Sequence, residues 1–493
     1  MSDALERFFL QYYRRRPVNA TFTGVHAFDE LLPDWSPAGI DALDAEMRSL
    51  RGDLDVGRYE GADAVDAELA GAYLDIQLAE NASQHGVRGN PSLWVGEAAF
   101  SIIGLITRGR TAEARIAAIP AFLETARATL SQPIPALWIT KALHECEGAI
   151  KLGTDASPAF AAFARWLETA PVAPDSTMAC GPALFDLLLH RGHQTRRSRA
   201  DLLAEARHRF AEERARLHEM GWAEAEQALA SDVPGAEEYL GEFQRVWDAC
   251  RARVAMHDAV SWPDWPIRYT PIPEATRAAA PYLYYLFYRS PAPYDPYVIH
   301  DYVVPSAPVS RSVIKLNHVV HHGAVGHHVQ NWHACHRAAS RIGRVAAVDC
   351  ASRIGMFCGG TMAEGWACYA TGLMDELGFL TPLEQVSEQH TRVRFLGRAI
   401  VDIELHEGTM TFDGAVHFYA EQVGMHPDMA RNEAVKNSMF PCTALMYWLG
   451  TQGILDLRAS MPQKPLREFH DELLSHGSIP VPMIARLMTG GVS

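Results

Sequence analysis

The sequence predicts a mostly α-helical protein with little or short β-sheet. Apolar residues recur at helical spacing over much of the chain, beginning with a first helix whose apolar positions are Leu5, Phe8, Phe9 and Tyr12. Pro17 is expected to end that helix, because proline lacks the backbone donor that a helix interior needs. Few segments show the alternation of apolar and polar residues that is typical of a half-buried strand.

The same periodicity predicts the helices that follow. Their Ala, Leu, Glu and Arg content favours helix, and they cover residues 63–78, 111–130, 158–167, 198–220 and 235–257. A later helix is expected to run from about 361 to 377. The best strand candidates are residues 267–270 and 302–304, on their β-branched and aromatic content.

Proline-rich stretches separate two halves of the chain. Residues 261–273 and 290–296 are dense in proline, which removes a donor and biases the preceding residue away from helix. We therefore expect three parts: a helical N-terminal part over 1–260, a connecting segment over 261–310, and a helical C-terminal part over 311–493. A chain of 493 residues can bury a large core, and one continuous globular body is favoured over separable domains.

Composition restricts the partners and the compartment. The net charge of -15 argues against nucleic acid and anionic membrane as partners, since both attract basic surfaces. No apolar run is long enough to span a bilayer, and the first residues lack the apolar region of a signal peptide. The 8 cysteines are dispersed without a Cys-x-x-Cys pair, which fits a reducing compartment. We expect a cytoplasmic protein with a small-molecule or short-peptide substrate, and leave a homodimer open.

The stretch 321–328, which reads His-His-Gly-Ala-Val-Gly-His-His, carries the strongest chemical signal. Neutral imidazole is the commonest protein ligand for a transition metal, and two histidines with a distant carboxylate form many catalytic zinc sites. His321 and His327 are six residues apart, so a break in the helix is needed to bring both to one ion. Gly323 and Gly326 permit such a break, because glycine tolerates unusual backbone geometry.

Together with residues 364–369, Glu-Gly-Trp-Ala-Cys-Tyr, this block resembles a known family. The chain is similar to the bacterial domain-of-unknown-function family 885, which is grouped with gluzincin-type zinc metallopeptidases and carries His-Glu-x-x-Pro-Gly-His-His followed by Glu-Gly-Trp-Ala-x-Tyr. The resemblance covers nearly the whole chain. It also rests on Pro17, Ala20, Thr21, Gly24, His26, Asp34, Trp35, Ser36, Arg398, Ala399, Ile400, Val401, Asp402, Leu405, His406, Pro441, Tyr447 and Gly450.

The resemblance implies a large helical, zincin-like body with a central cleft. It implies zinc ligands at His321, at one of His327 and His328, and at Glu364. Asp402 and His406 match a later helix that would line the same cleft. Tyr447 matches a tyrosine that could donate a hydrogen bond to an oxyanion, a role that His406 could share.

Two positions depart from the family pattern. His322 stands where the family has the glutamate expected to act as general base, and Val325 stands where it has proline. Histidine can serve as a base, since its pKa lies near neutrality. Alternatively His322 could itself become a ligand, and a site with three histidines and a glutamate could suit iron or manganese as well as zinc.

Further candidates could bind substrate. Arg394 and Arg398 share a helix face with Asp402 and could clamp a carboxylate, although i,i+4 ion pairs on that helix are an equal alternative. Tyr369 follows Glu364 closely on the same expected helix and is a fourth candidate.

Three functions remain open on these observations. The first is a zinc-dependent hydrolase acting on an amide bond of a small peptide or an amino-acid conjugate, with His322, Tyr447 and His406 as catalytic groups. The second is a metalloenzyme recruited to a non-peptidase step in small-molecule biosynthesis. The third is a non-catalytic binding protein on a peptidase scaffold. The sequence holds neither a Gly-x-Ser-x-Gly elbow nor a Walker-type loop, so serine hydrolase and nucleotide chemistry are unsupported.

Overall fold

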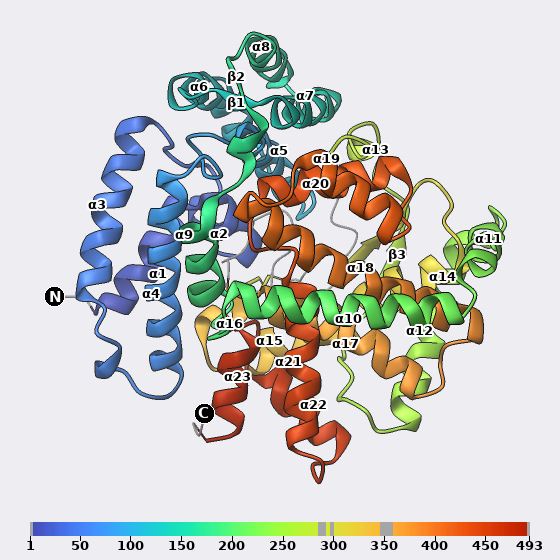
Figure 1. The fold of residues 1–493 in the computed structure, drawn as a ribbon. Coiled ribbons are helices and arrows are strands. Elements are labelled where there is room, and N and C mark those ends of the chain that lie inside the picture. The colour runs from blue at the N-terminus through green and yellow to red at the C-terminus, as the bar shows by residue number, and fades with distance from the viewer. Residues whose placement is uncertain (1–2, 284–291, 296–299, 346–357, 491–493) are drawn as a thin grey trace.

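The computed structural model describes residues 3–283, 292–295, 300–345 and 358–490. Helices dominate it, and the described residues form just two sheets, each of two strands (Figure 1). The prediction of a mostly α-helical protein with short sheet is therefore confirmed. Part of the expected connecting segment, including residues 284–291 and 296–299, lies outside the described residues, and the boundaries at 260 and 310 stay predictions.

The helices before the proline-rich region are α1 Ala4–Arg15, α2 Pro17–Thr23, α3 Pro37–Asp53, α4 Gly61–Ala82, α5 Pro91–Ile106, α6 Glu113–Thr129, α7 Ala136–Lys151, α8 Ser157–Leu167, α9 Gly181–Leu187, α10 Arg199–Glu219, α11 Trp222–Ser231 and α12 Tyr239–Met256. Short 3-10 turns are η1 His26–Phe28, η2 Val56–Arg58 and η3 Asp175–Met178, and a π-helical turn is η4 Leu188–Gly192. Each predicted helix in this part overlaps one of these elements.

The later helices are α13 Glu274–Arg277, α14 Arg311–Val313, α15 His327–Arg337, α16 Arg341–Val345, α17 Gly360–Glu376, α18 Pro382–Glu407, α19 Phe412–His417, α20 Pro427–Met439, α21 Met446–Ser460, α22 Leu466–Ser475 and α23 Val481–Met488. Two further π-helices are η5 Ile314–Gly323 and η6 Phe418–Gln422. The helix expected over 361–377 is α17.

Proline acts at the first helix boundary as predicted. Helix α1 ends at Arg15, and Pro17 is the first residue of α2. The first helical position tolerates proline, because its backbone N–H would have no partner within the helix.

Both sheets are parallel and short. Strand β1 Ile134–Pro135 pairs with β2 Val172–Ala173, and β3 Ile267–Thr270 pairs with β4 His300–Val303. The strand predicted at 267–270 is confirmed. The strand predicted at 302–304 is observed at 300–303, so it begins two residues earlier than expected. In the second sheet Tyr269 stands opposite Tyr302, which later contacts the candidate site.

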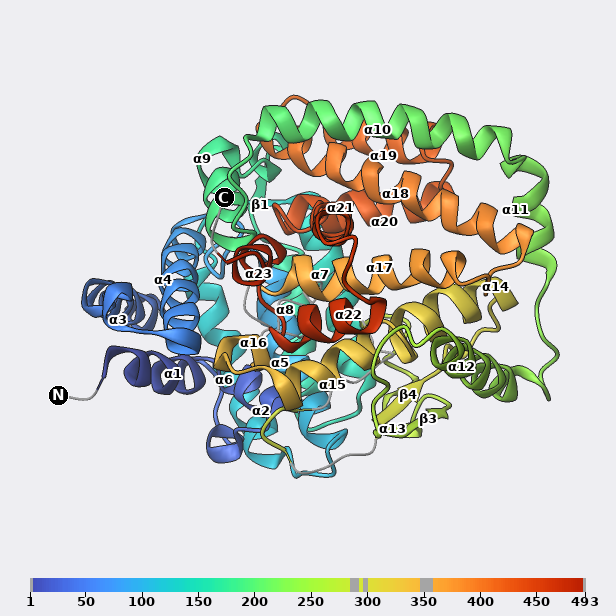
Figure 2. The ribbon, with the colours of Figure 1, turned by 90° about the horizontal axis from the view of Figure 1, so that it is seen from below.

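The buried apolar side chains form two large clusters. One joins α5–α8 to α18 and α20, with Trp94, Trp138 and Ile400 among its members. The other joins α1, α4 and α12 to η5, α17 and α22, with Phe8 and Trp366 among its members. Each cluster thus draws on both halves of the chain, and the helices from the two halves lie side by side in both ribbon views (Figures 1 and 2).

Two glycines bring α17 and α21 into close contact. A Cβ atom at Gly450 would lie 2.0 Å from the backbone oxygen of Thr361, and one at Gly365 would lie 2.5 Å from the backbone carbon of Gly450. Because no side chain fits between the helices, their backbones touch there. In Figure 2, α21 is viewed nearly along its axis and lies next to α17, which runs across the picture. This contact fixes the position of Glu364, the residue before Gly365.

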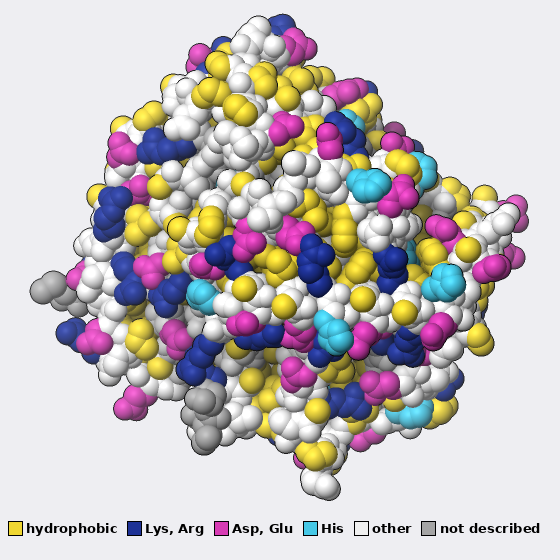
Figure 3. Space-filling model, viewed as in Figure 1, with side chains coloured by type: hydrophobic (Ala, Val, Ile, Leu, Met, Phe, Trp, Pro, Cys, Tyr) yellow, Lys and Arg dark blue, Asp and Glu magenta, His cyan; other side chains and the backbone are white. Residues whose placement is uncertain are grey.

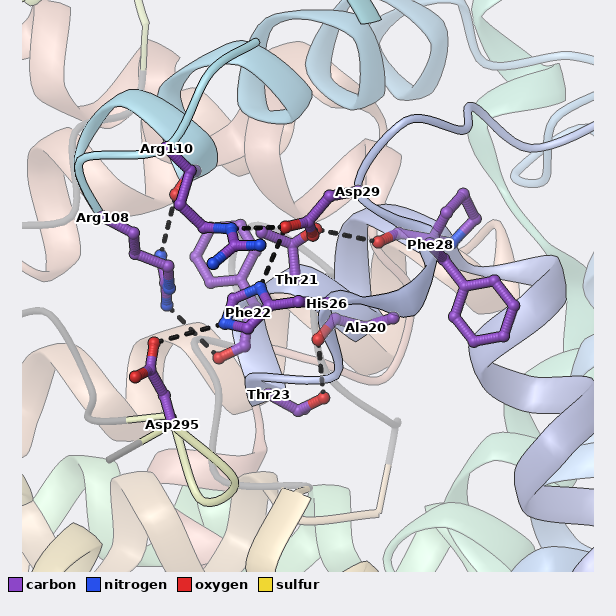
Figure 4. Close-up of polar contacts among 12 residues, drawn as sticks. Ala20, Thr21, Phe22, Thr23, His26, Phe28, Asp29, Arg108, Arg110 and Asp295 are labelled. Atoms are coloured by element: carbon purple, nitrogen blue, oxygen red, sulfur yellow. Dashed lines mark hydrogen bonds and ion pairs between the residues drawn. The ribbon is translucent and has the colours of Figure 1, made fainter. Parts of the chain in front are cut away.

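Residues 292–295 lie against the N-terminal helices (Figure 4). His26 is the centre of this contact, with Nδ1 at 2.9 Å from Asp29 and Nε2 at 3.4 Å from Asp295. Arg110 pairs with Asp29 at 2.6 Å, and the backbone N–H of Tyr294 donates to Thr23 at 3.0 Å. The contact ties a segment of the proline-rich region to α2 and η1.

The surface carries charges of both signs. On the face shown in Figure 3, basic and acidic side chains are interspersed with apolar ones. Within the described part of the chain, no helix combines the length and the apolarity needed to cross a bilayer.

Candidate metal centre

The break between η5 and α15 brings His327 to the pair His321 and His322. Residues 314–323 form a π-helix, and π-helical turns occur often at functional sites. The chain then turns sharply, and the backbone N–H of Gly326 donates to the carbonyl of Val320 at 2.9 Å. A Cβ atom at Gly326 would lie 1.9 Å from the carbonyl oxygen of His321, so this turn requires glycine. The break that the spacing of His321 and His327 demands lies at this point.

Three histidines converge after this turn. His321, His322 and His327 each offer a ring nitrogen within 4.8 Å of the others. Their ring centroids are 4.6 Å apart for His321 and His322, 5.0 Å for His321 and His327, and 5.4 Å for His322 and His327. Three histidines grouped in this way could hold a metal ion, since imidazole is a common metal ligand.

Glu364 completes the cluster from α17. Its Oε2 atom lies 3.3 Å from Nε2 of His321 and 3.7 Å from Nε2 of His327, and its side chain is 10% exposed. Burial alone would raise the pKa of this carboxyl, but the two histidines hold it well below its usual range. Glu364 is therefore a carboxylate aimed at two imidazole nitrogens, which is the charge state of a metal ligand.

A backbone contact fixes the orientation of His322. Its Nδ1 atom lies 2.7 Å from the carbonyl oxygen of Asn317. A carbonyl can only accept, so Nδ1 carries the proton and Nε2 keeps its lone pair. Burial and the neighbouring His321 and His327 lower the pKa of His322 well below its usual value, which keeps the ring neutral. A histidine held by a backbone carbonyl in this way is typical of a metal ligand.

His318 lies behind His322 and is held from the short sheet. Its Nδ1 atom is 2.6 Å from the hydroxyl of Tyr302 in β4. Burial and His321 lower the pKa of His318 to about 4, so it stays neutral. The ring stacks 6.4 Å from that of His322 and supports it.

His328 lies apart from the cluster. It is fully buried, and its Nε2 atom is 3.2 Å from the carbonyl oxygen of Trp265. The expectation that left His327 and His328 as alternatives is therefore corrected to His327. Neighbouring residues of a helix point in different directions, and the start of α15 at His327 turns that residue toward Glu364.

Tyr369 lies in α17 with its side chain in the core, and its expected role in substrate binding stays a prediction. Its hydroxyl lies 2.7 Å from Nε2 of His470 and accepts a hydrogen bond from Arg458 at 2.9 Å. Nδ1 of His470 lies 2.6 Å from the carbonyl of Ala259, so Nε2 accepts the hydroxyl proton. Both hydrogen-bonding functions of the tyrosine are used inside the core.

Asp402 is fully buried in α18, and its expected place in the substrate cleft stays a prediction. Its two carboxylate oxygens accept hydrogen bonds from the backbone N–H groups of Cys442, Ala444 and Leu445 at 3.0, 2.9 and 3.1 Å. The carboxylate therefore holds the turn that leads into α21.

Both ring nitrogens of His406 are hydrogen-bonded to backbone groups, and its expected catalytic role stays a prediction. Nδ1 accepts from the backbone N–H of Cys180 at 3.3 Å, and Nε2 donates to the carbonyl of Asn437 at 2.9 Å. Burial and His85 lower the pKa of His406 to about 3. The ring is thus neutral and bound to backbone on both sides.

We expect Asp402→Ala to lower the free energy of unfolding by about 3 kcal/mol or more, because two buried N–H groups and one partly buried N–H group lose a charged acceptor. Urea unfolding followed by circular dichroism measures this change. Asp428→Ala is the control, since that side chain is 90% exposed and should change stability little. Equal stability of the two variants would contradict the structural role of Asp402.

The two arginines of α18 differ in their pairing. Arg398 forms an ion pair with Glu433 at 2.7 Å and lies over the ring of Tyr447 at 4.9 Å. Among the described residues, Arg394 forms no ion pair and its buried Nε atom has no hydrogen-bond partner. Its charge contributes to lowering the pKa of His321, so it acts on the histidine cluster. Arg394 is thus the better candidate for an anionic ligand.

Tyr447 belongs to this arginine group. Its ring stacks on that of Phe395 with centroids 5.0 Å apart, beneath the Arg398 guanidinium.

The sequence spacing of the histidines could not indicate Asn317, the residue that orients His322. The contact is made by a backbone carbonyl, which every residue possesses.

The fold and the site define a helical protein with three partly buried histidines that could hold a metal ion, next to one buried glutamate. Residues 147–488 match the family described as "Bacterial protein of unknown function (DUF885)". The match covers more than half of the chain, so the protein belongs to this family, and the family expected from residues 321–328 and 364–369 is confirmed.

Two solved structures share the fold. A protein described as a "putative lipoprotein of unknown function" from Shewanella oneidensis is 19% identical with a TM-score of 0.76, and the alignment covers 99% of each chain. A protein described as a "putative lipoprotein" from Colwellia psychrerythraea is 17% identical with a TM-score of 0.66, over 99% of this chain and 97% of that one. At these identities the likeness extends to the fold alone. No curated protein matches the chain.

Proposed function

We propose that the protein is a metal-dependent hydrolase that cleaves an amide bond of a small peptide or an amino-acid conjugate. The observation that carries the proposal is the convergence of His321, His322 and His327, with ring nitrogens within 4.8 Å, on the side of Glu364. Zinc is the expected metal, with iron or manganese as alternatives. The proposal includes the gluzincin-type activity that the resemblance at residues 321–328 and 364–369 implies.

The residues present fit a metal ion. Glu364 is buried and the three histidines are partly buried. The pKa of the Glu364 carboxyl lies well below its usual range, and burial lowers the pKa values of His321 and His322, so these groups have the charge states that metal ligands need. His321, His327 and Glu364 would hold the ion. When bound, it supplies Lewis-acid polarisation of a carbonyl group and acidifies water.

His322 would act as the base in this hydrolase. Its Nδ1–H is held by Asn317, so the lone pair at Nε2 faces the other ligand atoms and can take a proton there. It thus replaces the glutamate that other family members carry at this position. Arg394 would bind a substrate carboxylate, and Tyr447, in the same arginine group, is a candidate for an oxyanion donor.

A second function is favoured by the spacing of His322. A ring nitrogen of His322 lies within 4.8 Å of those of the other two histidines, so His322 could be a fourth ligand in a site of three histidines and one glutamate. Such a site suits iron or manganese. In that case the protein would be a metalloenzyme that catalyses a non-peptidase step on a small molecule.

His322→Ala separates these two functions. If His322 is a base, His322→Ala should keep its metal content near one equivalent and lose hydrolysis. As a ligand, its loss should lower metal content as strongly as His327→Ala does. Inductively coupled plasma mass spectrometry on both variants and on the unaltered protein measures the difference. His328→Ala is a control for removing an adjacent histidine outside the cluster, once circular dichroism shows that it folds.

Hydrolysis itself is tested with dipeptides and N-acyl amino acids, by following the release of free amine. We expect Arg394→Gln to raise KM for substrates with a free carboxylate by about 10-fold or more, since a charged hydrogen bond contributes about 1.5–3 kcal/mol. The corresponding amides should be unaffected. Arg392→Gln, which removes a partly exposed guanidinium two residues away, is the matched control. Equal losses for acids and amides would contradict a carboxylate-binding role.

Small-molecule or short-peptide substrates follow from this proposal, and a cytoplasmic location is part of it. A metal content below about a tenth of an equivalent after supplementation with zinc, iron or manganese would overturn both functions, because each needs the ion.

A further inference from the structure

A cavity lies between α4, α5, α7 and α20. Its volume is about 680 Å³, within the range of about 300–1,000 Å³ that small-molecule sites occupy. None of His321, His322, His327 and Glu364 lines it. No sequence spacing indicates this cavity, because its walls come from helices far apart in the chain.

The cavity has apolar walls and charged groups. Trp35, Phe100 and Phe440 supply aromatic surface, while Arg16 and Glu97 supply opposite charges. Such a combination of apolar wall and a few polar groups is typical of a ligand site. Lys141 and Glu145, which also line the cavity, are already paired with each other at 3.1 Å.

Arg16 and Glu97 form no ion pair with each other, although the charge of each affects the pKa of the other. Burial raises the pKa of Glu97 to about 7, against the opposing charges of Arg16 and Arg115. Arg16 lies over the ring of Tyr73, with Cζ 5.9 Å from its centroid. Within the part of the chain that the structure describes, neither Arg16 nor Glu97 forms an ion pair. Desolvated charges of this kind are costly unless a partner neutralises them.

Gly96 keeps one wall of the cavity open. It lies inside α5 and lines the cavity, and a Cβ atom built there would meet nothing within 4 Å. Glycine inside a helix costs about 0.5–1 kcal/mol relative to alanine. Packing does not require glycine at this position, and a side chain added there would project into open space.

We propose that this cavity binds an α-amino acid with a bulky apolar side chain. Its ammonium group faces Glu97, its carboxylate faces Arg16, and its side chain lies on the aromatic wall. An α-amino acid carries an ammonium and a carboxylate on one carbon, which suits two oppositely charged side chains that line one cavity without an ion pair between them. This site is independent of the metal centre and of the proposed hydrolysis.

Isothermal titration calorimetry of the full chain with L-phenylalanine tests the proposal. Binding should be saturable, and 3-phenylpropionate and 2-phenylethylamine should each bind about 10-fold more weakly or worse, because each leaves one protein charge unpaired. The same affinity is expected for protein stripped with a chelator, which separates this site from the metal centre. Absence of binding, or equal binding of all three compounds, would overturn the proposal.

Two variants locate the site. Gly96→Leu should fill the cavity and abolish binding without loss of helix content. Gly241→Leu is its control, since Gly241 is an exposed helical glycine with open space at its Cβ position and lies outside the cavity. Glu97→Gln should weaken binding of L-phenylalanine by about 10-fold and leave 3-phenylpropionate unchanged. Unchanged affinity in Gly96→Leu would show that the amino acid binds elsewhere and would sink the proposal.

Discussion

Glu364→Gln is expected to empty the metal centre while leaving the fold intact. The amide keeps the shape of the side chain but loses the negative charge that faces His321 and His327 at 3.3 and 3.7 Å. Loss of a group outside the ligand shell typically costs about 10–100-fold in metal affinity, so loss of a ligand charge should cost more. Hydrolysis should fall in step with metal content.

Competition with a metal-binding dye gives the affinity of each form of the protein. Glu376→Gln is the matched control, because it removes the same charge at the partly exposed end of the same helix, where Glu376 pairs with Arg458. It should bind metal like the unaltered protein. If Glu364→Gln retained full metal affinity, the ligand set would have to lie elsewhere.

Gly326→Ala should damage the same centre through the backbone. The new Cβ atom would lie 1.9 Å from the carbonyl oxygen of His321 and 2.7 Å from that of Val320, so the turn between η5 and α15 must move. We expect a loss of about 1–3 kcal/mol in the free energy of unfolding, as overpacked sites show. Because the turn brings His327 to His321, metal affinity should also fall.

The same two measurements, urea unfolding and dye competition, apply to this variant. Gly372→Ala is the control, since the nearest atom to its Cβ position is the flexible end of Arg392 at 3.3 Å. It lies in α17, the helix that carries Glu364, and alanine there should be neutral or slightly stabilising. A Gly326→Ala protein that binds metal normally would show that the turn does not determine the site.

Local sequence patterns predicted many of the helices and one of the strands. Helical periodicity found α4, α6, α8, α10 and α12, and Pro17 marked a helix boundary, because these features depend on residues within one or two turns. The strand at 267–270 was found by its β-branched and aromatic content. The two-residue strands β1 and β2 were missed, since a pair of residues carries no periodicity.

The candidate site was predictable in its residue types and only partly in its geometry. His321, His327 and Glu364 lie together, while His328 contacts the carbonyl of Trp265. Asp402 and His406 were expected in the cleft, and their side chains bind backbone groups. Both sit on a helix that is buried on several sides, and periodicity does not say which neighbour each side faces.

The sequence by itself determined a mostly α-helical protein of this family and the residue types that could bind a metal, because these follow from local pattern and composition. Tertiary structure alone decided that His327 rather than His328 joins the cluster, that Asn317 orients His322, and that Arg16 and Glu97 share a cavity. Each of these depends on backbone turns and on contacts between segments far apart in the chain, which no local pattern encodes.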